Sequence, residues 1–299
     1  MAENLRLLYR QKVLLALLEV FRGNADSTDF LKLMFLYCAY NKQKHYSFFP
    51  YRFGCFSFEI YKDKRTLTEK GLLADMDRFS VAQNIGMLYQ LNAAERRQML
   101  DFARQLGDIR GDALIRKTYL EFPEYMVKSE IKDRILSPDE QAGLFLVPDD
   151  LFKPEPSIYT IGYEGIGIDE YLNKLIKNKI DAVVDVRKSP NSMKFDFNAR
   201  ALNNFLSKAG MEYIGIPDLG IPAEQRHELN TMTDYQALFE TYDREILPGQ
   251  MSQVRCIAEL IAAGKKVALT CFEAKHTMCH RYRIAVCLNR EYGYPVVNL

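Results

Sequence analysis

Five reactive side chains of four chemical kinds fall close together near the C-terminal end of the sequence. Residues 267–270 form a short apolar run that predicts a buried strand, and residues 279–292, after a brief polar loop, form an amphipathic stretch that predicts a helix. A dense set of reactive groups at one strand-to-helix turn predicts a functional site. The side chains fall within eleven residues and are Cys271, Glu273, Cys279, His280 and Arg281.

Cys279 is the candidate nucleophile of this stretch. It opens the predicted helix beside His280 and Arg281, and both a helix N-terminus and neighbouring cations lower the pKa of a thiol. His280 is then the neighbouring base that takes the thiol proton. Cys271, at the end of the strand, is either part of the site or a small apolar core residue.

The same stretch also offers metal ligands. Four side chains are of types that bind zinc: Cys271, His276, Cys279 and His280. Their spacing matches no standard zinc pattern, so the sequence predicts no metal, and thiol or zinc chemistry on a small molecule stays an alternative. Arg281 either binds substrate or pairs with an acidic neighbour such as Glu164 or Glu273.

A glycine-rich turn follows the first strand of the C-terminal half and contains Tyr163 and Glu164. Gly162, Gly165 and Gly167 allow the backbone to approach a ligand closely, and the helix after them offers unpaired N–H groups to an anion. The spacing is neither a Rossmann fingerprint nor a Walker A loop. A tight strand-to-helix turn also requires glycine, so both interpretations stay open.

The second strand of this half ends in a charged pair. Asp185 and Arg187 are two residues apart on a strand, so they point to the same side. They form either an internal ion pair or a site in which Arg187 holds a phosphate while Asp185 orients a reacting group. Ser192, in the loop that follows, is a further candidate for ligand contact.

These motifs need a scaffold that brings them together. Apolar strands alternate with helices in this half, which predicts an α/β fold with a mostly parallel sheet covered on both faces. Ligands of such sheets lie beyond the carboxyl ends of the strands, so the polar motifs are expected at one shared edge. The strands are predicted at 158–161, 182–186, 213–216, 267–270 and 296–297, and the helices at 168–177, 199–209, 235–246, 250–263 and 279–292.

Five motifs of the C-terminal half, taken in order, resemble the domain of unknown function 488 family. The resemblance spans about residues 158–299, and one departure from the family is Gly220-Ile221-Pro222, where a second glycine is common. It implies an α/β domain whose motif side chains belong together, and it implies no reaction. The motifs are Thr160-Ile161-Gly162-Tyr163-Glu164-Gly165, Asp185-Val186-Arg187 with Pro190 and Ser192, Tyr213 with Pro217 and Leu219-Gly220, Leu269-x-Cys271-x-Glu273, and Cys279-His280-Arg281.

The N-terminal half is predicted to be mainly helical and winged-helix-like. Helices are expected over 4–22, over 30–40 with a cap at Ser27 or Thr28, over 92–116, and over 118–146 with a break at Pro123. Residues 46–73 are aromatic, and within them 56–60 fit either a short strand or the start of a helix. This segment resembles Panacea-type antitoxin domains through its Phe-Pro-Tyr and Gly-x-Phe-Ser sequences and a helix that ends near Lys-Gly.

The range from Lys42 to Lys70, which overlaps this aromatic segment, is basic, with seven Lys/Arg against three acids. Basic residues interleaved with aromatics favour nucleic-acid binding. The alternative is an aromatic core wrapped in solvated charges, and a winged helix serves protein contacts as readily as DNA. Nucleic acid and a protein partner are therefore both possible for this half. The basic residues are Lys42, Lys44, Arg52, Lys62, Lys64, Arg65 and Lys70.

Composition sets the limits of these interpretations. The 299 residues, of which 48% are hydrophobic, suffice for two domains, predicted at 1–150 and 158–299 and joined by a proline- and acid-rich linker at 151–157. A formal net charge of +1 provides no global field to attract nucleic acid or an anionic membrane. The charged N-terminal stretch is no signal peptide and no run is long enough to span a membrane. Six irregularly spaced cysteines predict reduced thiols and a cytoplasmic protein.

The sequence therefore predicts an intracellular enzyme that acts on a nucleotide or nucleic-acid component at the carboxyl edge of the C-terminal sheet. A non-catalytic regulator that binds nucleic acid or a ligand is the alternative from another class, and the cofactor is left open. The candidate catalytic residues are Cys279, His280, Glu273, Asp185 and Glu164. The candidate ligand-binding residues are Gly162, Tyr163, Gly165, Arg187, Ser192, Cys271 and Arg281.

Overall fold

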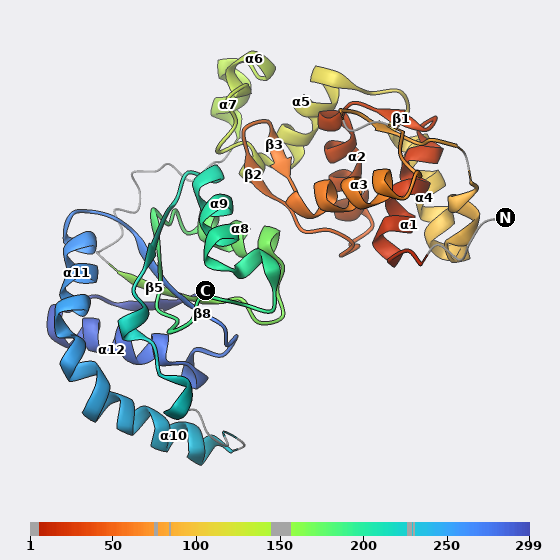
Figure 1. The fold of residues 1–299 in the computed structure, drawn as a ribbon. Coiled ribbons are helices and arrows are strands. Elements are labelled where there is room, and N and C mark those ends of the chain that lie inside the picture. The colour runs from red at the N-terminus through yellow and green to blue at the C-terminus, as the bar shows by residue number, and fades with distance from the viewer. Residues whose placement is uncertain (1–5, 75–76, 84, 145–156, 226–228, 230) are drawn as a thin grey trace. The chain divides into compact units, whose positions relative to one another are not determined.

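The computed structural model describes residues 6–74, 77–83, 85–144, 157–225, 229 and 231–299. The chain divides into two compact units, residues 1–147 and 148–299 (Figure 1). Each unit has a hydrophobic core of its own. Except for Ser157, the linker predicted at 151–157 lies outside the described residues. None of the helices in the described part of the chain is long and apolar enough to cross a membrane.

The N-terminal unit consists mostly of helices, with two small antiparallel strand pairs. The helices are α1 (Tyr9–Val20), α2 (Ser27–Tyr40), α3 (Phe58–Glu69), α4 (Ala93–Leu106), α5 (Gly111–Glu121), α6 (Lys132–Ile135) and α7 (Pro138–Gly143), with short turns η1 (Met87–Gln90) and η2 (Pro123–Tyr125). The strand pairs are β1 (Asn24–Ala25) with β4 (Phe79–Ser80) and β2 (Phe49–Tyr51) with β3 (Gly54–Phe56).

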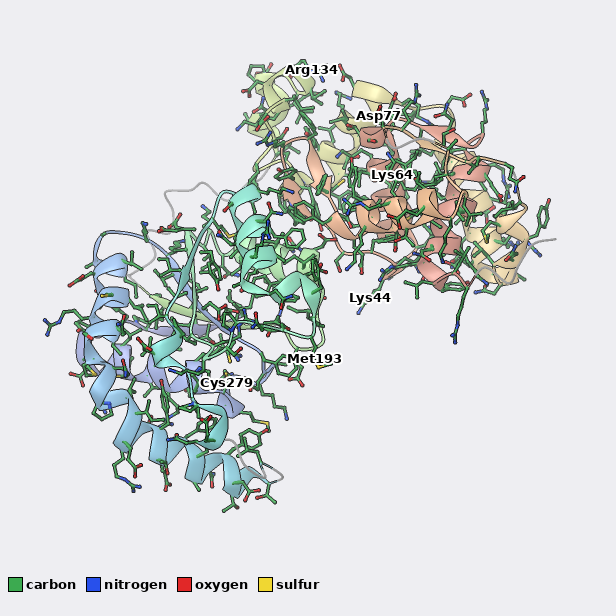
Figure 2. All side chains as sticks on the ribbon, in the orientation of Figure 1. Lys44, Lys64, Asp77, Arg134, Met193 and Cys279 are labelled. Carbon is green, nitrogen blue, oxygen red and sulfur yellow. The ribbon has the colours of Figure 1, made fainter. Side chains whose placement is uncertain are left out.

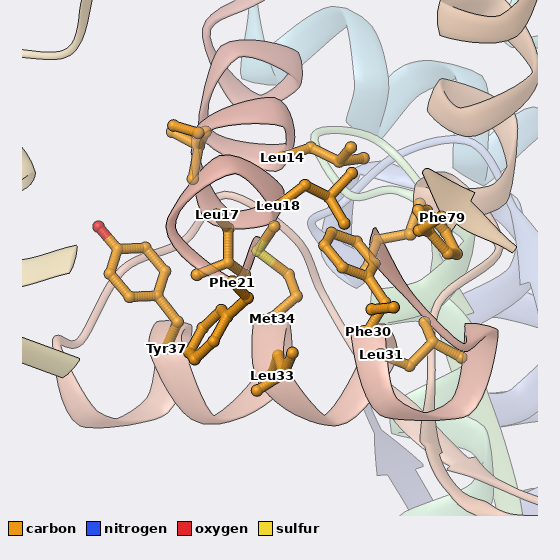
Figure 3. Close-up of a cluster of buried hydrophobic side chains, with 14 of the residues drawn as sticks. Leu14, Leu17, Leu18, Phe21, Phe30, Leu31, Leu33, Met34, Tyr37 and Phe79 are labelled. Atoms are coloured by element: carbon orange, nitrogen blue, oxygen red, sulfur yellow. The ribbon is translucent and has the colours of Figure 1, made fainter. Parts of the chain in front are cut away.

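The core of the N-terminal unit lies where α1 and α2 pack together (Figure 3). Leu14, Leu17 and Leu18 follow the three- and four-residue spacing of one helical face and are buried. From α2, which is buried over most of its length, the ring of Phe30 stacks on Phe79 with 4.1 Å between the ring centroids. The apolar composition of α2 predicts this central position.

Two predicted features of the N-terminal unit are changed by local chemistry, and an alternative left open for a third is settled. The helix predicted over 92–116 is two helices, because Gly107 and Gly111 adopt φ values of +61° and +59°, in the left-handed region that interrupts a helix. The predicted caps of α2 are wrong: the helix begins at Ser27, whose hydroxyl donates to the carbonyl of Asp77. Residues 56–60 contain both alternatives, the end of β3 and the start of α3.

The C-terminal unit is an α/β domain, as predicted. Its five parallel strands lie in the order β7-β6-β8-β5-β9. The strands are β5 (Ile158–Gly162), β6 (Ala182–Asp185), β7 (Glu212–Gly215), β8 (Val267–Cys271) and β9 (Val296–Asn298). The helices are α8 (Ile168–Lys177), α9 (Ala199–Lys208), α10 (Met232–Thr241), α11 (Met251–Ala262) and α12 (His280–Tyr292), with turns η3 (Phe195–Phe197), η4 (Pro217–Leu219), η5 (Ala223–Gln225), η6 (Tyr242–Ile246), η7 (Leu247–Gln250) and η8 (His276–Met278).

The strand order places a topological switch point at β8. The connections through α8 and α9 run toward one edge of the sheet, and the later connections through α11 and α12 run back toward the other. Because such crossovers are right-handed, α8 and α9 cover one face while α11 and α12 cover the other (Figure 1). The helix after β8 therefore leaves on the opposite face from the helices after β5 and β6, which opens a crevice at the carboxyl end of β8.

Candidate functional site

The ends of β5, β6 and β8 meet at one edge of the sheet, as the sequence predicts. In the strand register Gly162 lies opposite Cys271, and Asp185 lies opposite Thr270. A cavity of about 580 Å³ opens at this edge. It is lined by Tyr163, Gly165, Arg187, Lys188, Ser189, Asn191, Ser192, Met193, Lys194, Ile221, Cys271, Phe272 and Glu273.

Six of the predicted site residues line this cavity: Tyr163, Gly165, Arg187, Ser192, Cys271 and Glu273. Six others do not line the cavity but lie next to residues that do: Gly162, Glu164, Asp185, Cys279, His280 and Arg281. Among the described residues, the predicted set is thus divided between a wall that a ligand can touch and a layer that supports this wall.

Gly162 and Glu164 hold two loops together at the edge of the cavity. A Cβ at Gly162 would lie 1.9 Å from the carbonyl oxygen of Glu273, so only glycine fits there. The backbone N–H of Glu164 donates to the carbonyl of Phe272 at 2.8 Å, and its carboxylate accepts from the backbone N–H of Ala274 at 2.9 Å. The glycine turn after β5 therefore fixes the course of the chain after β8.

Arg281 supports the same loop from inside the protein. Its side chain is buried, and its two terminal nitrogens donate to the carbonyls of Glu273 at 2.5 Å and Ala274 at 3.2 Å. The predicted carboxylate partner is therefore wrong, since the guanidinium bonds to backbone oxygens. Nε of Arg281 has no hydrogen-bond partner within the described part of the chain.

Asp185 and Arg187 form the internal ion pair that was one of the two predicted alternatives. The Arg187 guanidinium donates to both carboxylate oxygens of Asp185, at 2.8 and 2.5 Å, and to the hydroxyl of Tyr163 at 2.6 Å. Tyr213 donates a further hydrogen bond to Asp185 at 2.8 Å. Burial by itself lowers the pKa of Arg187, but Asp185 outweighs this effect and raises it, so the pair stays ionised.

The ring of Tyr163 is enclosed by neighbouring side chains. It stacks on Phe197 with 4.3 Å between centroids and 7° between the ring planes, and the Arg187 guanidinium lies 5.1 Å from its centroid. Phe272 contacts Tyr163 edge-on and remains 43% exposed. The aromatic surface that the cavity offers to a ligand is therefore Phe272.

Two thiols and one imidazole lie close together beneath the cavity. His280 Nδ1 is 3.7 Å from Cys271 Sγ and 3.9 Å from Cys279 Sγ, and all three residues are buried. His280 Nε2 is 2.8 Å from the carbonyl oxygen of Val186. A carbonyl oxygen only accepts, so Nε2 carries the hydrogen, and in the neutral ring the Nδ1 lone pair points at the two sulfurs.

Glu273 connects this cluster to the cavity. Cys271 Sγ donates to Glu273 Oε2 at 3.3 Å. Burial raises the pKa of Glu273, but hydrogen bonds from Cys279, from its own backbone N–H and from Cys271 outweigh burial, so the pKa lies below its ordinary value. Glu273 is therefore an ionised acceptor on the cavity wall.

The predicted low pKa of Cys279 is wrong. Burial, followed by the neighbouring Cys271, raises the pKa of Cys279 well above that of an ordinary thiol. The start of α12 and the nearby His280 do not offset the loss of water around a residue that is 2% exposed. An unassisted Cys279 is thus a protonated thiol at neutral pH, and it does not line the cavity.

Several lining residues were missed as candidates from the sequence. Lys194 donates to the carbonyls of Tyr163 at 3.2 Å and Ile166 at 2.8 Å, and Lys188 lies 3.7 Å from an oxygen of Asp218. Met193 is fully exposed at the edge of the unit (Figure 2). The available signal was position, because residues 188–194 form the loop after β6 and such loops border the ligand in parallel sheets.

In the N-terminal unit, the aromatic segment packs largely against itself. Phe49, Phe56 and Phe58 form mutual ring contacts at 5.0 to 5.7 Å, and Lys64 is buried with its Nζ 4.4 Å from the Phe79 ring centroid. These contacts fit the predicted aromatic core, and Lys64 belongs to it. The other six basic residues between Lys42 and Lys70 lie at the surface, and nucleic-acid or protein binding by this unit stays a prediction.

Comparison with known proteins gives one match. No curated protein and no solved structure matches the chain. The model of the family described as "Domain of unknown function DUF488" matches residues 167–288, which run from the start of α8 into α12. The predicted resemblance is therefore confirmed over residues 167–288, which contain four of the five quoted motifs, and this part of the chain matches the DUF488 family model.

Proposed function

We propose that the C-terminal unit is an enzyme domain that binds a nucleotide or a nucleic-acid component in the carboxyl-edge cavity and acts on it there. The observation that carries this proposal is the composition of the cavity wall. Ammonium groups, an exposed aromatic ring and the hydrogen-bonded pair Cys271–Glu273 line one cavity of about 580 Å³ at a topological switch point.

Two lysines supply the sites for a phosphate. Lys188 and Asp218 are separated by 3.7 Å and their side chains are 46% and 58% exposed, so this weak ion pair is easily replaced by a stronger anion. Lys194 uses two of its three ammonium donors on backbone carbonyls, which leaves one donor for a ligand. Arg187 adds little net charge, because Asp185 neutralises it.

Phe272 supplies the site for a base. Stacking of a base on an aromatic side chain contributes about 1–3 kcal/mol and tolerates any base. Glu273 follows Phe272 directly, so a ligand stacked on this ring has the Glu273 carboxylate and the Cys271 thiol beside it. A carboxylate in this position accepts a proton from a ligand or from an attacking water.

The other assignments concern location and partners. We infer a cytoplasmic protein, because all six cysteines are free. For the N-terminal unit we infer a nucleic-acid or protein partner, supported by the surface positions of Lys42, Lys44 and Lys62.

Binding and turnover are tested separately. In calorimetric titrations with nucleoside mono- and diphosphates and short single-stranded oligonucleotides, we expect Phe272→Ala to weaken binding about tenfold. Lys177→Ala, an exposed lysine of α8 outside the cavity lining, should bind as the original chain does. Mass spectrometry of the same mixtures should find a product that is absent with Glu273→Gln, while binding persists.

Two outcomes would change this assignment. Failure of every probe to bind would overturn the proposal. Binding without any product, in the original chain, would replace the enzyme by a ligand-responsive regulator.

A further inference from the structure

The side chains of Cys271, Cys279 and His280 converge inside the C-terminal unit. The three come from the end of β8, the residue before α12 and the first residue of α12. One ligand atom of each lies within 4.8 Å of the others, and the side chains are 1%, 2% and 2% exposed. Ordinary core packing does not require two sulfurs and a ring nitrogen to point at a common centre.

The distances in this cluster are close to those around a tetrahedral ion. With Zn–S of about 2.3 Å and Zn–N of about 2.0–2.1 Å, tetrahedral geometry separates sulfur from nitrogen by about 3.5 Å. The two sulfur–nitrogen distances here are 3.7 and 3.9 Å. The two sulfurs lie within 4.8 Å of each other, where a tetrahedral ion needs about 3.8 Å, so side-chain rotations of less than about 1 Å bring all three ligand atoms to bonding distance.

The orientation of the His280 ring is that of a metal ligand. A histidine that binds a metal through one nitrogen usually donates the other N–H to a carbonyl or carboxylate, which fixes the tautomer and aims the lone pair. Nε2 donates to the carbonyl of Val186 at 2.8 Å, and Nδ1 faces both sulfurs. Val186 directly follows β6, so the central sheet itself holds the ring in place.

We propose that Cys271, Cys279 and His280 bind one zinc ion at the floor of the cavity. Two thiolates and an imidazole match the preference of zinc for soft sulfur and nitrogen ligands. The proposal replaces the sequence prediction of no metal, and it holds whichever ligand fills the cavity.

Among the residues that the structure describes, three potential zinc ligands meet in this cluster, which leaves a fourth position. Cys271 also lines the cavity, and so does Glu273, whose carboxylate lies 3.3 Å from Cys271 Sγ. The fourth position therefore faces the cavity beside Glu273. Three protein ligands with an open position are typical of catalytic rather than structural zinc sites.

Metal content provides the direct test. Elemental analysis of the full-length chain, purified without chelator, should find about one zinc per chain. Cys271→Ser, Cys279→Ser and His280→Ala should each lose most of it. Cys256→Ser is the matched control, because Cys256 is an exposed thiol on α11 of the same unit, and it should retain zinc as the original chain does.

A second measurement avoids variants that fail to fold. Addition of Co²⁺ to the chelator-treated original chain should produce the visible bands of thiolate-bound tetrahedral cobalt, and Cys256→Ser should produce them equally. Absence of these bands together with absence of zinc would overturn the proposal.

The alternative state of this cluster is a disulfide between Cys271 and Cys279, and counting free thiols detects it. A disulfide requires the sulfurs to approach to about 2.0 Å. If the denatured, unreduced and metal-free original chain shows four free thiols of its six while Cys279→Ser shows all five of its own, Cys271 and Cys279 form a redox disulfide, which would overturn the zinc site. These measurements concern the metal alone, so they are independent of the nucleotide titrations that test the proposed function.

Discussion

At the scale of single residues, the cavity wall depends on a residue behind it: Arg187 lines the cavity and Asp185 holds it in place. Asp185 and Arg187 are 1% and 5% exposed and are bonded to each other and to two tyrosines. A buried pair is not by itself a gain in stability over apolar residues, but removal of one partner leaves an uncompensated charge. Arg187 is therefore held in one orientation by a network that tolerates no partial loss.

Asp185→Asn should cost about 3–5 kcal/mol in the free energy of unfolding, because it leaves the Arg187 guanidinium buried without a counter-charge. The control is Glu212→Gln, which breaks an ion pair with Lys265 whose side chains are 50% and 40% exposed and should cost less than about 1 kcal/mol. Urea unfolding of both variants is the measurement. Equal costs for the two would contradict this account of the pair.

The buried thiol of Cys38 should make the free energy of unfolding fall as the pH rises in the alkaline range. Burial raises the pKa of Cys38 from 9.0 to about 12. Because the folded pKa is above the unfolded one, this stabilisation is complete below pH 9 and is lost as the pH rises toward 12. Between pH 8 and 10 the thiol should account for a loss of about 1.4 kcal/mol.

Urea unfolding of Cys38→Ala at these two pH values tests the prediction. The variant should lose about 1.4 kcal/mol less than the original chain over the interval, since the other titrating groups are common to both. Cys256→Ser, at an exposed thiol, should follow the original chain. Parallel pH profiles for Cys38→Ala and the original chain would show that the buried thiol is not the cause.

At the scale of elements, the turn after β5 and the loop after β8 are held in fixed positions relative to each other. Gly162→Ala places a methyl group 1.9 Å from the Glu273 carbonyl oxygen, which belongs to the backbone and cannot rotate away. We expect a loss of at least about 2 kcal/mol and weaker ligand binding, because the loop that carries Phe272 and Glu273 must shift. Urea unfolding and nucleotide titration measure the two effects.

Gly249→Ala is the matched control, since a Cβ at Gly249 meets nothing within 4 Å. It should change the free energy of unfolding by less than about 0.5 kcal/mol. If Gly162→Ala unfolds like this control, the close contact between the two loops does not exist in solution.

The strands and helices of the C-terminal unit can be predicted from the sequence more completely than the contacts between its side chains. Apolar runs such as 158–161 and 267–270 predict buried parallel strands, and parallel pairing alone then brings their polar ends to one edge. The partners of Arg281 are backbone carbonyls, which any sequence provides, so no residue type signalled them. The break between α4 and α5 depends on glycine dihedral angles that the surrounding helical pattern conceals.

The cluster of Cys271, Cys279 and His280 shows the same difference: the sequence predicts which elements carry these residues but not that their side chains meet. Eight positions separate Cys271 from Cys279, and whether their sulfurs meet depends on the course of the loop between them. Arg281 and Glu164 set that course through bonds to Glu273 and Ala274. The spacing of Cys271, Cys279 and His280 in the sequence therefore does not reveal whether their ligand atoms meet, because that depends on the fold of the loop between them.

At the scale of the whole molecule, a zinc ion would stabilise one unit and leave the other unchanged. A ligand that binds only the folded state stabilises the region whose unfolding releases it. Both thiols and the imidazole belong to residues 148–299, and the α1–α2 core of the N-terminal unit contains none of them. A single melting temperature would average over both units, and with no tryptophan in the chain intrinsic fluorescence does not separate them well.

Hydrogen exchange separates the two units residue by residue. Zinc-loaded chain should exchange more slowly than chelator-treated chain in β8 and in the first turns of α12, while exchange in α1 and α2 should be the same in both samples. His280→Ala should give the chelator-treated pattern even with zinc present, and Cys256→Ser should respond as the original chain does. Slower exchange spread over both units, or none around residues 267–285, would contradict a zinc site that is built into the C-terminal sheet edge alone.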